Sequence, residues 1–205
     1  MDVYFDPLLY EPGEGWTYST SIDWAGVVVE RVGGCGRLQE YMDKNIWNPL
    51  GMKAITFRPD ERQDISSSMM QMLIRDNNGG LTTSKTTMDT SNFKFDAGGA
   101  GLFLQPTEFT KLLCSLLRND EIVLKGESVD MMFTPQLPDA KYLRAFMDSN
   151  PLSYSLLRGL PLSIKYNWGF GGIVTQEDVP GRRRSGSLMW GGLPNCSWVS
   201  FFPFV

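Results

Sequence analysis

The clearest repeat of apolar residues in the chain lies between Thr107 and Arg118. Its apolar side chains recur three and four positions apart, the spacing that gathers them on one face of a helix: Phe109, Leu112, Leu113, Leu116 and Leu117. We expect Thr107 to cap this helix and Glu108 to stabilise its first turn. The pattern predicts an amphipathic helix from Thr107 to Arg118.

A second apolar pattern of helical period follows Thr20. Thr20 and Asp23 form a start signal of the type Ser/Thr-x-x-Asp/Glu, and Gly33-Gly34 is a typical stop. Between them, apolar residues recur at helical spacing: Trp24, Ala25, Val28, Val29 and Val32. The stretch therefore predicts a helix that begins shortly after Tyr18.

Weaker patterns predict further short elements. Helices are expected at Arg37–Trp47, where Asn48-Pro49 ends the run, at Ser66–Ile74 with a methionine face, and at Glu127–Phe133. A short strand is expected within Ala54–Phe57. Three later pieces are rich in β-branched and aromatic residues and are expected to be antiparallel neighbours: Trp168–Thr175, Ser187–Trp190 and Ser197–Phe202.

Four stretches without a clear helix or strand pattern separate these elements. Asp76–Gly80 lacks the alternating carboxylates of a calcium loop and is interpreted as a turn. Thr82–Ser91 is expected to be an exposed loop. Asp96–Gly101 is a glycine turn before a short apolar run, without the lysine of a phosphate loop. Lys141–Tyr166 shows no clear period and is either a pocket-lining loop or a long connection.

Composition narrows the classes of protein. The 205 residues are 42% hydrophobic and 20% charged, with a net charge of −4, as in an ordinary, mildly acidic globular protein. Arg182-Arg183-Arg184 is the longest basic run, so we expect no nucleic-acid partner. No segment approaches 18 consecutive apolar residues, and Asp2 and Asp6 do not suit a signal peptide. We therefore expect no membrane span and a cytoplasmic location.

The absence of histidine excludes several mechanisms. A Ser-His-Asp or Cys-His mechanism and a histidine-ligated metal site cannot be built from this chain. Acid–base chemistry must fall to tyrosine, lysine or carboxylates, and we expect neither a metal nor another cofactor. Cys35, Cys114 and Cys196 are far apart in the sequence and are predicted to be buried, reduced thiols.

Tyr18 stands just before the predicted helix that follows Thr20. A tyrosine is a poor base near neutral pH unless its surroundings stabilise the phenolate, and the free N–H groups at a helix start do so. On this stretch alone, a tyrosine that packs against Trp16 or Trp24 is the simpler interpretation.

Four segments together resemble a known family. They are PGEGWTYSTSIDWAGVVVERVGG from Pro12, NPLGM at Asn48–Met52, DAGGAGLFLQPTEFTKLL at Asp96–Leu113, and GSLMWGGLPNCSW at Gly186–Trp198. In this order they resemble the serine β-lactamase-like esterases and acyltransferases of the class C β-lactamase and penicillin-binding-protein superfamily, especially those of fungal polyketide pathways. The resemblance implies an α+β sandwich, with an antiparallel sheet flanked by helices.

The resemblance also implies roles for particular residues. In that family the serine of a Ser-x-x-Lys motif attacks an ester or β-lactam carbonyl, and the lysine and a tyrosine share the work of the general base. Tyr18 would be that tyrosine. Trp190, Gly191 and Gly192 would stand in the place of the Lys-Thr-Gly box at the substrate, and the N–H of Leu193 would help to hold the oxyanion. A core aromatic is the structural alternative for Trp190.

The nucleophile of the family has no counterpart before Tyr18. One Ser-x-x-Lys occurs, at Ser91–Lys94, on the other side of Tyr18 and in a polar stretch. We therefore expect residues 1–205 to form a partial β-lactamase-like domain that lacks the nucleophile region and the C-terminal end. The implied substrate is a small-molecule ester or acyl thioester, and an acyl carrier protein is a candidate partner.

Three interpretations remain open. The chain is part of a serine esterase or acyltransferase, a non-catalytic short paralogue that binds an acyl ligand or a partner protein, or an enzyme in which Ser91 attacks in an unorthodox arrangement.

Overall fold

The computed structural model describes residues 7–84, 95–151, 153–157, 159–192 and 195–201. The chain divides into two compact units. The first combines Met1–Tyr18 with Ser115–Val205, and the second is the continuous segment Ser19–Cys114. The unit that contains Tyr18 is therefore assembled from both ends of the chain.

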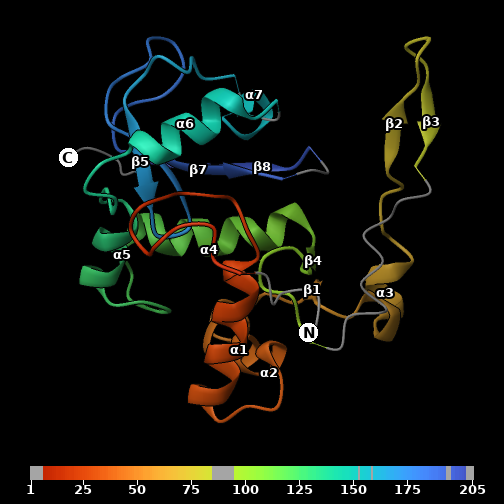
Figure 1. Cartoon of the computed structure of the whole chain (residues 1–205). Helices are drawn as coiled ribbons and strands as arrows, with labels where there is room; N and C mark the ends of the chain where they lie inside the picture. Colours follow the sequence, from red (N-terminus) through yellow and green to blue (C-terminus); the bar gives the residue numbers. More distant parts are fainter. Residues whose placement is uncertain (1–6, 85–94, 152, 158, 193–194, 202–205) are drawn as a thin grey trace. The chain divides into compact units, whose positions relative to one another are not determined.

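A four-stranded antiparallel sheet is the centre of the first unit (Figure 1). Its strands follow one another in space as in sequence: β5 (Tyr166–Gly169), β6 (Gly172–Thr175), β7 (Leu188–Gly191) and β8 (Ser197–Ser200). The expected piece Trp168–Thr175 is in fact a tight hairpin, because Gly171, with φ of 107°, reverses the chain between β5 and β6. The prediction of antiparallel neighbours is confirmed.

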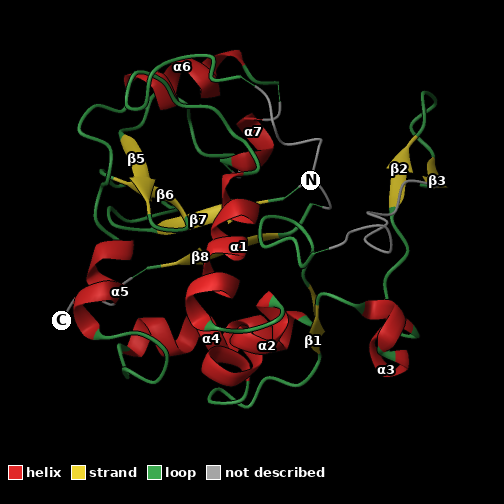
Figure 2. Ribbon diagram, turned by 60° about the horizontal axis from the view of Figure 1, so that its bottom comes forward, coloured by secondary structure: helices red, strands yellow, loops and turns green. Residues whose placement is uncertain are grey.

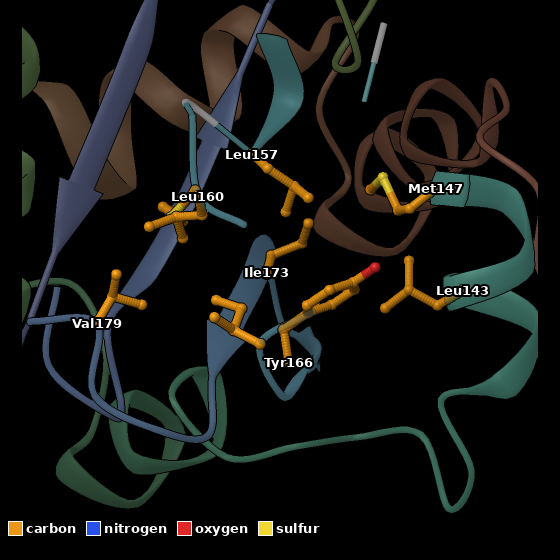
Figure 3. Packing of buried hydrophobic residues seen from close by; sticks show 9 residues of the cluster. Leu143, Met147, Leu157, Leu160, Tyr166, Ile173 and Val179 are labelled. Atoms are coloured by element: carbon orange, nitrogen blue, oxygen red, sulfur yellow. The ribbon is translucent and has the colours of Figure 1, made fainter. Parts of the chain in front are cut away.

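Helices α5 (Gly126–Met132), α6 (Lys141–Ser149) and α7 (Ser153–Leu156) accompany this sheet. The core lies between α6 and the strands, where Leu143 and Met147 of α6 meet Tyr166 of β5 and Ile173 of β6, all fully buried (Figure 3). Lys141–Tyr166 was expected to have no regular structure, which is wrong. Leu143, Phe146 and Met147 have the three-and-four spacing of a helix, and burial of that face stabilises α6.

The second unit begins with α1 (Ser21–Gly33), close to the predicted limits. Gly34 takes the left-handed conformation (φ 63°) and closes the helix through its N–H to Glu30 O. The expected capping pair is wrong: Thr20 makes no side-chain cap, and the Asp23 carboxylate accepts from Gly99 N at 2.7 Å. Asp23 therefore ties α1 to the glycine turn before β4 (Phe103–Leu104).

Helix α2 (Leu38–Met42) continues as a π-helical segment, Asp43–Trp47, so the predicted helix over Arg37–Trp47 is confirmed. Strand β1 (Ile55–Thr56) pairs antiparallel with β4. The apolar core of this unit is formed by the buried residues Leu38, Trp47, Met52, Ile55 and Phe57.

A buried carboxylate joins three parts of the second unit. Asp96, whose side chain has no exposed surface, accepts hydrogen bonds from Arg58 Nε (3.1 Å), Arg37 Nη2 (3.5 Å) and the Gln39 backbone N–H (3.0 Å). Gln39 in turn accepts from the Thr56 hydroxyl and Phe57 N, both at 3.0 Å. This network fixes α2 against β1 and the glycine turn.

Helix α4 (Pro106–Arg118) confirms the strongest helical pattern. It begins at Pro106, so Thr107 lies in the first turn and does not precede the helix as its cap. Glu108 of this turn accepts from Lys53 N at 2.8 Å and Lys111 Nζ at 2.9 Å. The bond from Lys111 is the main reason that the pKa of Glu108 lies below its usual value.

A two-stranded hairpin follows a short helical region. The 3₁₀ turn Pro59–Glu61 and α3 (Gln63–Ser66) lead to β2 (Leu73–Arg75), which pairs with β3 (Leu81–Thr83) (Figure 2). The helix expected over Ser66–Ile74 is wrong, and Met70 is 92% exposed. The turn at Asp76–Gly80 is confirmed: the Asp76 carboxylate accepts from Asn78 N and Gly80 N. Of the expected loop Thr82–Ser91, Thr82 and Thr83 belong to β3, and residues 85–94 lie outside the described part.

The cysteines are thiols, but they are not buried. Cys35 is partly exposed, and Cys114 and Cys196 are exposed. The prediction of burial is therefore wrong. Cys114, for example, lies in α4 two positions before the buried Leu116 but is itself exposed.

Candidate active site

Two of the predicted site residues meet in the first unit. The ring centroids of Tyr18 and Trp190 are 5.6 Å apart, with the planes inclined at 38°. Tyr18 is 53% exposed, whereas Trp190 is half-buried and packs against the core under the sheet. The first and the last of the four segments that carry the family resemblance thus meet through these two rings.

Three further aromatic rings extend this contact into a row. Trp190 meets Trp168 edge-on, with centroids 4.9 Å apart and planes at 82°. Trp168 lies 5.2 Å from Trp16, and Trp16 lies 5.1 Å from Phe146 of α6. We call Tyr18, Trp190, Trp168, Trp16 and Phe146 the aromatic row. The sequence alone indicates no role for Trp168, and it suggests Trp16 only as a packing partner of Tyr18. The alternation of Trp16 and Tyr18, two positions apart, was the available signal for a shared face.

The glycines beside Trp190 form the end of β7 and the turn that follows. Gly191 is buried and pairs with Ser197 across the β7–β8 ladder. Gly192 is exposed, its N–H donates to Cys196 O at 2.9 Å, and its carbonyl accepts from Asn195 N at 3.0 Å. The N–H of Gly192 is therefore engaged in the turn. Leu193, the expected oxyanion donor, lies outside the described residues.

Other candidate chemistry lies elsewhere or is not described. Ser91 and Lys94 belong to the segment that the structure leaves undescribed. In the described residues, no three acidic, cysteine or histidine side chains come close enough together to hold a metal ion. The chemistry that the described site offers is one exposed phenol beside an aromatic wall.

Tyr18 and Trp190, two residues that the family resemblance assigns to the site, thus meet in a protein that combines helices with antiparallel sheets. The chain belongs to the Beta-lactamase family, because the model of that family matches residues 3–186.

Curated relatives narrow the comparison within the family. The chain is 37% identical over 202 residues to the ML-236A carboxylate methylbutanoyltransferase of Penicillium citrinum, covering 94% of this chain and 46% of that protein. It is 36% identical over 202 residues to the lovastatin esterase of Penicillium rubens, covering 96% of this chain and 50% of the relative. The chain thus spans about half the length of these relatives.

A solved structure agrees with the same relationship. The unliganded selenomethionyl simvastatin synthase of Aspergillus terreus superposes with a TM-score of 0.88 at 33% identity, covering 96% of this chain and 49% of that one. The expected β-lactamase-like α+β fold is therefore confirmed. None of the helices in the described residues is both long enough and apolar enough to cross a membrane.

Proposed function

We propose that this chain provides the tyrosine and substrate-strand part of a β-lactamase-like serine esterase or acyltransferase of polyketide metabolism. The observation that carries the proposal is the contact between Tyr18 and Trp190, whose ring centroids are 5.6 Å apart. The relatives named as a methylbutanoyltransferase and an esterase support acyl-group chemistry on small molecules.

The proposed reaction passes through an acyl-serine. The serine Oγ attacks the carbonyl carbon of an ester or thioester, and its proton passes to the base that Tyr18 and a lysine share. The oxyanion is held by backbone N–H groups, of which Leu193 would supply one. Collapse of the tetrahedral intermediate expels the alcohol or thiol, which takes up the proton. An acceptor alcohol or water then attacks the acyl-serine in the same way.

Within this scheme Trp190, Gly191 and Gly192 form the edge along which the acyl group lies. Gly191 is fixed in the ladder and the N–H of Gly192 is used by the turn, so these two glycines contribute close backbone approach. The half-buried ring of Trp190 offers an apolar wall beside the phenol of Tyr18. No metal or other cofactor takes part in the scheme.

The scheme also suggests the partners, and the cysteines suggest the location. The acyl donor is a small ester or thioester, and an acyl carrier protein is the proposed carrier of the thioester. We place the protein in the cytoplasm, because three thiols, two of them exposed, suit a reducing compartment.

A second candidate is a non-catalytic paralogue that binds an acyl ligand or a partner protein. The partly exposed aromatic row would serve such binding without a nucleophile.

The intact mass of the natural protein, with its N-terminal peptides, separates the two candidates. A longer chain with Ser-x-x-Lys upstream, labelled on that serine by a fluorophosphonate probe, supports the enzyme. A folded, monodisperse protein of this length that resists the probe refutes the enzyme and supports the binding protein. Labelling of Ser91 instead would establish the unorthodox nucleophile.

A further inference from the structure

We propose that Trp168 is a positioning residue that fixes the ring of Trp190 and, through it, the ring of Tyr18. The inference rests on the proposed function, because it concerns the residues assigned to that site. Trp168 contacts rings on both sides: Trp190 at 4.9 Å and Trp16 at 5.2 Å. Trp16 precedes Tyr18 by two residues, so Trp168 contacts both chain segments that supply the site.

The geometry of these contacts suits a residue that holds neighbouring rings in place. The rings of Trp168 and Trp190 meet at 82°, so that the edge of one indole faces the plane of the other, the favoured arrangement of aromatic pairs. The tilt of 58° between Trp168 and Trp16 is also far from a parallel stack. Each contact restricts the rotation of the ring that it touches, so Trp190 cannot turn away from Tyr18 without losing its contact with Trp168.

Trp168 is itself held firmly at its backbone. Its carbonyl accepts from Gln136 N at 2.8 Å, and its N–H donates to the Asn167 side chain at 2.7 Å. Asn167 is buried, and its amide group also exchanges two hydrogen bonds of 3.0 Å with the backbone of Leu137. These bonds fix β5 to the segment that precedes α6, and they hold the backbone of Trp168 in one position.

The neighbouring positions leave β5 little room to move. Ile173, which pairs with Trp168 across the hairpin, is fully buried. A Cβ atom at Gly169 would collide with Met132 O, so the strand is packed closely against the end of α5. The far end of the aromatic row is anchored as well, because Phe146 stands on α6 beside the buried Met147. Trp190 is thus fixed through Trp168 to two helices and a hairpin.

The proposed task is orientation. An indole offers no general base at neutral pH, and Trp168 stands one ring removed from Tyr18 in the row. Its removal should therefore leave the chemistry in place but widen the range of Trp190 and Tyr18 positions, and loss of orientation lowers the rate. We expect Trp168→Ala to lower kcat about 10-fold with a small change in KM, and Trp168→Phe, which retains a ring, to recover most of the rate.

The first arm of the test measures position without activity. The chain is labelled with 3-fluorotyrosine at Tyr18 and with 5-fluorotryptophan, and its ¹⁹F spectrum is compared between the wild type, Trp168→Ala and Trp168→Phe. Trp168→Ala is expected to shift and broaden the Trp190 and Tyr18 signals, and Trp168→Phe to restore them in part. Phe170→Leu is the matched control, because Phe170 is half exposed in the turn of the same hairpin. Unchanged Trp190 and Tyr18 signals in Trp168→Ala would overturn the proposal.

The second arm measures kcat and KM in a full-length protein that bears the nucleophile. A wild type without turnover, together with the expected ¹⁹F shifts, would refute the proposed function and retain the orientation of Trp190 by Trp168. Turnover that is equal in the wild type and Trp168→Ala would refute the positioning role alone. Trp168→Phe retains the ring and therefore keeps the test available if Trp168→Ala does not fold.

Discussion

The phenol ring of Tyr18 lies against the indole of Trp190, with centroids 5.6 Å apart. Tyr18 comes from the irregular N-terminal segment and Trp190 from strand β7. Each residue alone has an ordinary structural explanation, an exposed tyrosine and an aromatic at the border of a core. Their contact is more informative, because it joins two of the four segments that carry the family resemblance.

Replacement of Tyr18 by phenylalanine tests its role as a base. The ring and its contact with Trp190 remain, whereas the hydroxyl is lost, so folding should be unaffected. In a nucleophile-bearing full-length protein we expect turnover of an acyl thioester to fall roughly 10²–10⁴-fold, the usual contribution of a positioned general base. Tyr142→Phe, at a partly exposed tyrosine of α6, is the control. Equal turnover in the wild type and Tyr18→Phe would remove Tyr18 from the mechanism.

Loss of the Asp96 carboxylate should destabilise the second unit. Asp96→Ala leaves Arg58, Arg37 and the Gln39 N–H without their shared acceptor. We expect the free energy of unfolding to fall by about 2–4 kcal/mol, as measured by urea denaturation. Asp64→Ala, which breaks the exposed pair with Arg62, should change it little. A similar loss in both variants would contradict the structural role given to Asp96.

Tyr166→Phe should be tolerated and should stabilise the first unit slightly. Tyr166 is fully buried, and its hydroxyl has no hydrogen-bond partner among the described residues. Removal of an unsatisfied buried hydroxyl relieves a desolvation cost, so we expect a gain of up to about 1 kcal/mol in thermal or urea unfolding. A clear loss of stability would show that the hydroxyl is satisfied in solution.

The same tyrosine predicts a dependence of stability on alkaline pH. Burial raises the pKa of Tyr166 above its usual value of 10.0, and Arg144, 5.1 Å from the ring centroid, opposes this only in part. Above pH 10 the unfolded chain releases this proton while the folded chain retains it, so the stability falls as the pH rises. Denaturation curves at pH 9 and pH 11 should therefore differ more for the wild type than for Tyr166→Phe. Equal differences would contradict the raised pKa.

The exposure of the cysteines predicts two classes of thiol. Cys114 and Cys196 are exposed and should react rapidly with a disulfide reagent, whereas the partly exposed Cys35 should react more slowly. The coloured thiolate released from the reagent should appear as two fast equivalents and one slow equivalent per protein chain. Cys114→Ser should remove one fast equivalent and leave the slow phase unchanged. Three equal rates would contradict these exposures.

The sequence predicted the elements whose pattern is local and strong. Helix α4 has five apolar residues at helical spacing, and α1 carries Gly33-Gly34 at its end, so both were located within one or two residues. The turn at Asp76–Gly80 was recognised from its residue types. Helix α6 was missed because prolines at 151 and 161 obscured a short apolar repeat. Strand β2 was mistaken for part of a helix, since methionines do not distinguish an apolar face from an exposed hairpin.

The site was predicted in part. Tyr18 and Trp190 were named from motifs, but their contact depends on two segments meeting in space, which no local pattern encodes. Trp168 illustrates the limit: its strand was expected, yet its place between Trp190 and Trp16 follows only from the fold. Asp23 shows the same limit. It is typical of a helix start, yet its carboxylate accepts a hydrogen bond from the N–H of Gly99, far along the chain.

The discontinuity of the first unit has a consequence for synthesis on the ribosome. Tyr18 leaves the exit tunnel well before its partner Trp190, because the segment between them is translated first. The continuous segment Ser19–Cys114 is complete long before then and can start to fold during elongation. Tyr18 therefore cannot contact Trp190 until the intervening chain has been made. The first unit can therefore complete its sheet and bring Tyr18 to Trp190 only after the second unit has been translated.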